Sequence, residues 1–178
     1  MNTRRTAFLF LVALVSGWAW AAPLPSLTLT RLDGRSITLP QSGEALTVLV
    51  VGFSRRAGGL VDAWADRFDR DFGADPSVAI YRVAVLSGVP ALFRHLVLGS
   101  IKSSVPSEYR SRFLTTFRDG RAWKLIVGFH ERDEPYVLLV DRRGRVAATI
   151  SQAFDRRRYD VLAAAARSLL ARSRSTGR

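Results

Sequence analysis

The side chains in this sequence that could do chemistry are few. There is no cysteine, so a thiolate nucleophile and a cysteine-ligated metal are both excluded. The two histidines are His95 and His130, and His130 opens a polar run over residues 130–134. This run offers imidazole and carboxylate groups, but it lacks a recognised ligand spacing such as His-Glu-x-x-His. A solvated loop is therefore the better interpretation, and we expect no metal and no cofactor.

A serine nucleophile would have to come from a sharp turn between a strand and a helix. Ser54 follows an apolar run over 46–53, but no Gly-x-Ser-x-Gly pattern surrounds it. We assign no catalytic residue. An enzyme that uses Ser54 or His130 stays open as the alternative to a binding protein.

The elements that would position these side chains alternate between strands and helices, which predicts an α/β fold with a central mixed β-sheet flanked by helices in three layers. The Asp-Gly pair at 33–34 marks a hairpin, and Asp155 can cap the last helix. The expected elements are a hairpin over 27–39, strands over 46–53 and 78–86, a helix over 60–72 after loop residues 54–59, a mostly apolar segment over 91–101, a helical turn behind Pro106, a strand over 113–117, a short helix over 122–127, strands over 136–140 and 146–150, and the final helix.

The first 21 residues have the features of a secretory signal peptide. Arg4 and Arg5 precede an apolar run over 7–20, and Ala19-Trp20-Ala21 fits the small-x-small cleavage rule. We therefore expect export across the inner membrane to the periplasm, with an uncleaved anchor as the alternative. The expected division is a signal peptide over 1–21, one folded domain over 22–171 and a disordered basic tail over 172–178.

The chain is strongly basic, with a formal net charge of +12. Such a charge is compatible with nucleic acid or an anionic membrane surface as a partner. Arginine supplies nearly all of it, since the lysines are only Lys102 and Lys124, and this skew is typical of a GC-rich coding sequence. We expect no nucleic acid as a partner, whereas peripheral association with an anionic membrane stays open.

The segment from Glu134 to Val146 resembles the stretch that follows the active site in thioredoxin-like proteins. Pro135 opens an apolar strand, Asp141 closes it and Gly144 turns the chain back. The order of elements over 27–170 fits the same superfamily. The resemblance implies a thioredoxin-like scaffold in which the catalytic cysteines would fall at Ala57 and Leu60, or one position later in each case.

No side chain at those positions can form a thiolate, so the resemblance implies a redox-inactive protein that works by binding. Two arginines and backbone N–H groups of the degenerate loop could meet an anion, but a solvated remnant of a lost active site is favoured because the Lys-Ser/Thr pair of a phosphate loop is missing. The degenerate active-site loop comprises Ser54, Arg55, Arg56, Ala57, Gly58, Gly59 and Leu60.

The Glu134–Pro135 bond matches the place where thioredoxin folds hold a cis-proline beside the binding groove. The resemblance alone implies a cis bond, because cis X-Pro bonds are uncommon. The alternative is an ordinary proline at the start of a strand. Both stay open.

A narrower resemblance covers about half of the chain. Residues 98–109, 113–114, 123–128 and 135–141 are similar to the mitochondrial F-type ATP synthase assembly factor that chaperones the a subunit of the membrane sector. The resemblance implies an assembly factor or chaperone whose partner is a subunit of a membrane complex.

The apolar segment over 91–101 is the candidate partner-binding surface. A surface helix needs a single apolar stripe, and this segment carries apolar residues most of the way round. The alternative is a helix buried in an enlarged core. The candidate residues are Leu92, Phe93, Leu96, Val97, Leu98, Ile101 and Pro106.

Overall fold

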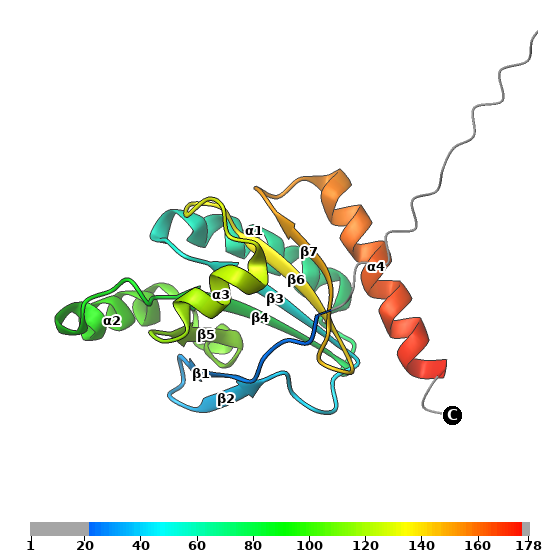
Figure 1. The fold of residues 1–178 in the computed structure, drawn as a ribbon, viewed down its shortest axis with the longest axis horizontal. Coiled ribbons are helices and arrows are strands. Elements are labelled where there is room, and N and C mark those ends of the chain that lie inside the picture. Colours follow the sequence, from blue (N-terminus) through cyan, green and yellow to red (C-terminus); the bar gives the residue numbers. More distant parts are fainter. Residues whose placement is uncertain (1–21, 176–178) are drawn as a thin grey trace, which may run out of the picture.

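The structure is a computed structural model that describes residues 22–175. Its mixed sheet has seven strands in the order β2-β1-β5-β4-β3-β6-β7, with helices on both faces (Figure 1). The elements are β1 (Leu27–Arg31), β2 (Ser36–Leu39), β3 (Leu46–Gly52), α1 (Arg55–Phe72), β4 (Val78–Val85), η1 (Ala91–Phe93), α2 (Arg94–Ser104), η2 (Ser107–Arg112), β5 (Phe113–Thr116), α3 (Gly120–Val127), β6 (Tyr136–Asp141), β7 (Val146–Ser151) and α4 (Arg156–Ser175).

The centre of the sheet is β3, which is buried along its whole length, as its continuous apolar run predicts. It pairs in parallel with β4 and antiparallel with β6, while β5 runs parallel to β4. The carboxyl ends of β3, β4 and β5 therefore lie at one edge of the sheet. That edge carries the start of α1, the η1–α2 segment and the turn after β5.

Each face of the sheet has its own hydrophobic core. On one face α1 and α4 bury Trp64, Phe68 and Tyr159 against the central strands. On the other face α3 buries Trp123 over the apolar side of the sheet, and Tyr136 belongs to the same cluster. The predicted three-layer arrangement is confirmed (Figure 1).

The β1–β2 hairpin turns at Gly34, where φ is +94°, a conformation that favours glycine. The hairpin joins the sheet through a short contact: β1 pairs with β5 only at Thr30–Thr115 and Arg31–Leu114. The rest of β1 diverges from β5. This divergence leaves room between the hairpin and the segment that follows β4.

The structure corrects parts of the sequence interpretation. Residues 55–59 are the first turns of α1 and not a loop, because Ser54 caps the helix and the buried Ala57 holds it against the sheet. Of the two alternatives left open for the Glu134–Pro135 bond, the structure shows the ordinary proline, and the cis bond among residues 22–175 is Leu39–Pro40. Residues 172–175 continue α4, whereas 176–178 and the predicted signal peptide over 1–21 lie outside the described residues.

Candidate functional site

Residues 54–60, predicted as a degenerate active-site loop, lie at the carboxyl end of β3 and form the cap and first turns of α1. The Ser54 side chain accepts a hydrogen bond from the Ala57 N–H at 3.1 Å and so caps α1. Arg55 and Arg56 are exposed in the first turn, while Ala57 is buried. The Ser54 hydroxyl is therefore committed to holding the helix, and the positions where the resemblance would place cysteines are ordinary helix residues.

The loop before β6 packs beside this helix start and is organised by the buried Tyr136. Its hydroxyl accepts hydrogen bonds from the His130 and Glu131 N–H groups at 3.1 and 2.9 Å and donates to the Glu131 carbonyl at 2.7 Å. Arg56 lies 3.5 Å from Asp133 and ties the loop to α1. These contacts fix the backbone of residues 130–133.

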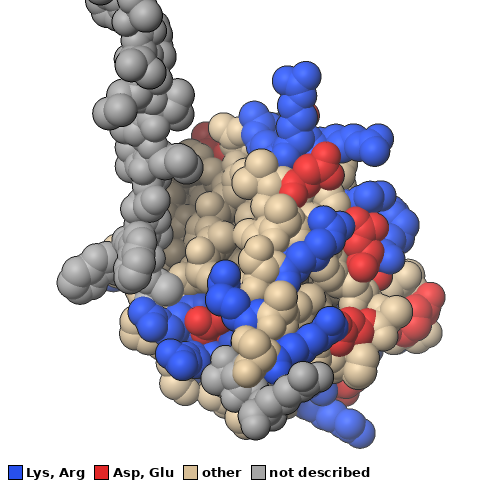
Figure 2. All heavy atoms as spheres, turned by 90° about the vertical axis from the view of Figure 1, so that its right-hand side faces the viewer, with Lys and Arg blue, Asp and Glu red and all other residues tan. Residues whose placement is uncertain are grey.

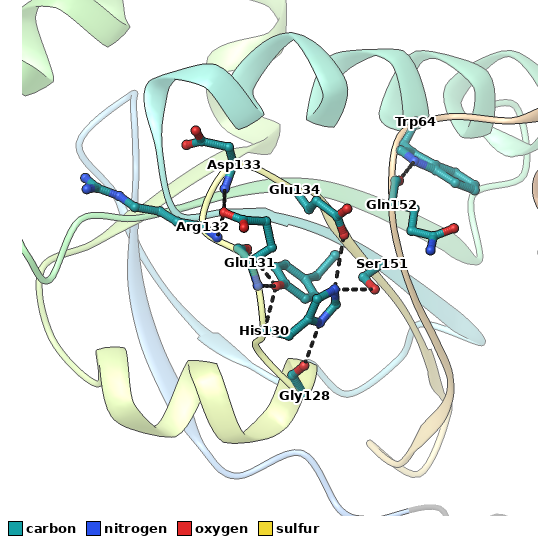
Figure 3. A network of polar contacts seen from close by, with 10 residues as sticks. Trp64, Gly128, His130, Glu131, Arg132, Asp133, Glu134, Ser151 and Gln152 are labelled. Atoms are coloured by element: carbon teal, nitrogen blue, oxygen red, sulfur yellow. Dashed lines mark hydrogen bonds and ion pairs between the residues drawn. The ribbon is translucent and has the colours of Figure 1, made fainter.

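His130 is the centre of a polar network near the start of this loop (Figure 3). Its Nδ1 lies 3.2 Å from the Gly128 carbonyl oxygen, which can only accept, so Nδ1 must carry a proton. Its Nε2 faces both the Glu134 carboxylate at 3.2 Å and the Ser151 hydroxyl at 3.4 Å.

This geometry differs from that of a Ser-His-acid triad. A triad places the serine and the carboxylate on opposite ring nitrogens, so that the acid orients the ring while the other nitrogen takes the serine proton. Here Ser151 and Glu134 meet the same nitrogen, and a backbone carbonyl holds the other. The arrangement orients the His130 ring, but it does not activate Ser151 as a nucleophile.

Gln152, next to Ser151, was not predicted to belong to this site. Its φ of +115° is rare outside glycine, and its carbonyl accepts a hydrogen bond from the Trp64 indole at 3.1 Å (Figure 3). An aromatic cluster of Phe53, Phe129 and Tyr136 forms the apolar base beside the loop. The pairing of Tyr136 with Ser151 across β6 and β7 brings these segments together.

The predicted partner-binding surface is exposed. No residue of η1 or α2 is buried, which excludes the alternative of a core helix. Leu92, Phe93 and Leu96 are 83%, 50% and 68% exposed and form the outer apolar patch. Val97, Leu98 and Ile101 are half-buried on the inner side of α2, and Pro106 is exposed. Binding at this surface stays a prediction.

None of the clusters of His, Asp and Glu side chains within residues 22–175 could hold a metal ion. Within the same range, no helix has the length and apolar character of a membrane span. The face that α4 covers carries many arginines with acidic side chains between them (Figure 2). This mixture of charges does not test the two expectations about partners. Peripheral association with an anionic membrane and the absence of nucleic acid as a partner both stay predictions.

Comparison with known proteins found no matching family model and no matching curated relative. Solved structures do match. A putative thiol:disulfide interchange protein DsbE from Chlorobium tepidum has a TM-score of 0.60 at 14% identity over 84% of this chain and 96% of that one. The chain has a thioredoxin-like fold.

Two further structures show the same fold. The pneumococcal exposed lipoprotein thioredoxin Etrx1 of Streptococcus pneumoniae matches with a TM-score of 0.57 at 13% identity over 80% of this chain and 98% of that one. BsSco, a member of the Sco family of cytochrome c oxidase assembly proteins, matches with a TM-score of 0.58 at 13% identity over 85% and 95%. The comparisons lend no support to the resemblance to the ATP synthase assembly factor.

The thioredoxin-like fold is thus present without the thiols that its redox members use. Because no cysteine stands anywhere in the sequence, Cys-based thiol–disulfide exchange is excluded. What the structure retains at the active-site position is a capped helix, a fixed loop and a histidine held by a carboxylate.

Proposed function

We propose that this is an exported, redox-inactive thioredoxin-fold protein that binds a protein partner, and that the partner is a subunit of a membrane complex during assembly. The observation that carries the proposal is the outer apolar patch of Leu92, Phe93 and Leu96. Helices of a monomeric soluble protein turn such residues inward, and an exposed apolar group of this kind marks an interaction site.

Two further observations support a binding role. The side chains at the former active-site position are committed to structure, so no nucleophile is left there. A neighbour in structure, BsSco, is a member of the Sco family of cytochrome c oxidase assembly proteins. Export is supported by the signal-like sequence over 1–21.

In-cell photo-crosslinking tests the proposal. A photoreactive amino acid at position 93 should capture one membrane-complex subunit, identified by mass spectrometry. The same amino acid at position 125, where Leu125 is 79% exposed on α3, serves as the control and should not capture it. A folded protein that gives no specific adduct from position 93 would refute the binding surface.

Charge substitutions provide the second arm. Leu92→Asp with Leu96→Asp should abolish capture of the partner, whereas Leu125→Asp should leave it intact. Because all of these side chains are exposed, each variant should unfold within about 0.5 kcal/mol of the parent in denaturant. Undiminished capture by the L92D/L96D protein would contradict the proposal.

A further inference from the structure

A groove of about 890 Å³ lies between α2, the β1 strand and the end of β5. It exists because the hairpin meets β5 over so few residues and because α2 stands away from the sheet (Figure 1). Its volume is in the range of sites that hold a sizeable ligand and is much larger than one ion needs. Neither the degenerate active-site loop nor the outer apolar patch lines it.

Cations dominate the wall of this groove. Arg31, Arg94, Lys102 and Arg118 line it, and Asp119 is the one carboxylate among its lining residues. Within residues 22–175 none of these four cations forms an ion pair with a carboxylate. The cations of the groove wall outnumber its one carboxylate, so the groove carries a net positive charge.

Arg94 is the cation placed most directly over the groove. Arg31 also lines it, but its side chain lies on the Leu27–Leu29 face of β1, because Arg31 pairs with the buried Leu114 while Thr30 pairs with Thr115. Arg94 lies over the Phe117 ring at 5.0 Å, and its Nε reaches the Val89 carbonyl only at 3.5 Å. Its guanidinium is held over the groove with most of its donors available.

The spacing of these groups fits an extended chain. Arg94 and Lys102 are eight residues apart on α2, which places their backbones about 12 Å apart along the helix axis. A single phosphate cannot contact both, whereas an extended peptide covers this distance in about four residues. Thr28 and Thr30 on the opposite wall are alternate strand residues, about 7 Å apart, which is the repeat of an extended peptide.

Apolar side chains favour a peptide over a simple polyanion. Leu32, Leu98 and Phe117 also line the groove and would contact aliphatic parts of a ligand. We propose that the groove binds an extended acidic segment of the protein partner, with two carboxylates about four residues apart along the chain. This inference rests on the proposed function, because α2 presents the groove on one side and the outer apolar patch on the other.

The test measures binding of fluorescein-labelled ten-residue peptides to residues 22–178 by fluorescence anisotropy. Each peptide carries two glutamates separated by two to eight positions on an otherwise constant Leu/Ser background, and matched peptides carry glutamine instead. Affinity should peak near a separation of four and fall about tenfold with glutamine, because charge-assisted hydrogen bonds are lost. Affinity that is independent of spacing and charge would overturn the proposal.

Charge reversal on the protein locates the site. Arg94→Glu with Lys102→Glu should lower the affinity for the tightest-binding peptide by at least about tenfold. Arg156→Glu with Arg157→Glu on α4 changes the net charge equally, and it should lower this affinity by less than about twofold. Both pairs are exposed, so folding is preserved. Equal weakening of peptide binding by the two pairs would overturn the proposal. It would also be overturned if no peptide bound, while inorganic polyphosphate or phosphatidylglycerol vesicles bound tightly and only R94E/K102E removed that binding.

The two proposals fail separately. If the R94E/K102E protein still captures the partner from position 93 with full yield, the groove inference fails and the proposed function stands. If the spaced glutamate peptide binds the groove while position 93 captures nothing in cells, the groove stands and the assembly role fails.

Discussion

Arg82 is a buried cation on the central strand β4, and replacing it with Met measures how much stability its carboxylate cluster contributes. Its guanidinium meets Asp62 at 3.2 Å and Asp69 at 3.1 Å, and it also contacts Asp66. The carboxylates are spaced by four and three residues on α1 and so share one helix face. Only 5% of the Arg82 side chain is exposed, and the Tyr109 ring covers it.

The magnitude follows from the exposure of the carboxylates left behind. Removing one partner of a buried ion pair costs about 3–5 kcal/mol, because the remaining charge is uncompensated. Here Asp62 and Asp66 are half-exposed and can be solvated, while Asp69 keeps a 3.2 Å ion pair with Arg112. We therefore expect R82M to lower the free energy of unfolding by about 2–3 kcal/mol and Tm by about 5–10 °C.

The loss should depend on pH. Burial raises the pKa of Asp62, although Arg82 opposes this shift. A carboxyl whose pKa is higher in the folded state is favoured there when protonated, so its contribution to stability is lost as pH rises through the folded pKa. Removing Arg82 raises the pKa of Asp62 further. The difference between parent and R82M should be largest at pH 7 and shrink as the pH falls toward about 4.

Guanidinium chloride titrations at pH 7 and pH 4.5 measure this difference. Arg112→Met is the control, because Arg112 is half-exposed and its ion pair should be worth less than about 1 kcal/mol. If R82M unfolds within about 0.5 kcal/mol of the parent at pH 7, or shows the same loss at both pH values, the electrostatic account of the cluster is refuted.

Further predictions concern single side chains. Gly144 has a φ of +72° and a Cβ there would lie 2.5 Å from Pro40, so G144A should lower the free energy of unfolding by about 1–3 kcal/mol in denaturant titrations. Gly58 lies in α1, and a Cβ there would meet open space, so G58A should raise the free energy of unfolding by about 0.5–1 kcal/mol. Equal effects of G144A and G58A would contradict this reasoning. Tyr136→Phe removes the hydroxyl that holds two backbone N–H groups, so Y136F should lose about 1–3 kcal/mol and speed amide exchange in the preceding loop, and unchanged exchange would count against its anchoring role. Hydrogen bonds from Ser77 lower the pKa of Asp75 in the folded protein. The stability that these bonds contribute is therefore present above the unfolded pKa of Asp75 and is lost as the pH falls through its folded pKa. D75N should thus be less stable than the parent at pH 7, with a deficit that shrinks as the pH falls below the unfolded pKa of 3.8; a constant deficit would argue against this linkage.

The positions of the strands and helices could be predicted because their signals are local. The apolar run of β3, the glycine after α3 and the Asp155 cap are each contained in a few residues. The start of α1 was placed too late because Gly58 and Gly59 are typical of loops. A serine cap and burial of Ala57 outweigh the low helix propensity of glycine here.

The site details could not be predicted, because they depend on pairing between distant segments. His130 meets Ser151 only through the register of β6 and β7, which no local pattern specifies. The groove needs β1, β5 and α2 together, and its charge pattern is spread over residues 31–118. Arg82 did carry a signal. An arginine within an apolar strand needs a charged partner when it is buried, and Asp62 and Asp69 on α1 supply one.

The parallel direction of the central strands places the start of α1, the exposed α2 and the cationic groove at the same edge of the sheet. Because β3, β4 and β5 run parallel, their carboxyl ends lie at one edge of the sheet, which is where open α/β sheets commonly place ligands. In this chain β3 leads to the capped start of α1, β4 leads to the exposed α2, and β5 leads to the groove wall at Arg118. Because the chain has no cysteine, this edge cannot carry thiol chemistry, but it keeps its place in the fold. A partner that approaches it meets the outer apolar patch and the cationic groove on two sides of one helix, so α2 is the element on which both proposals depend.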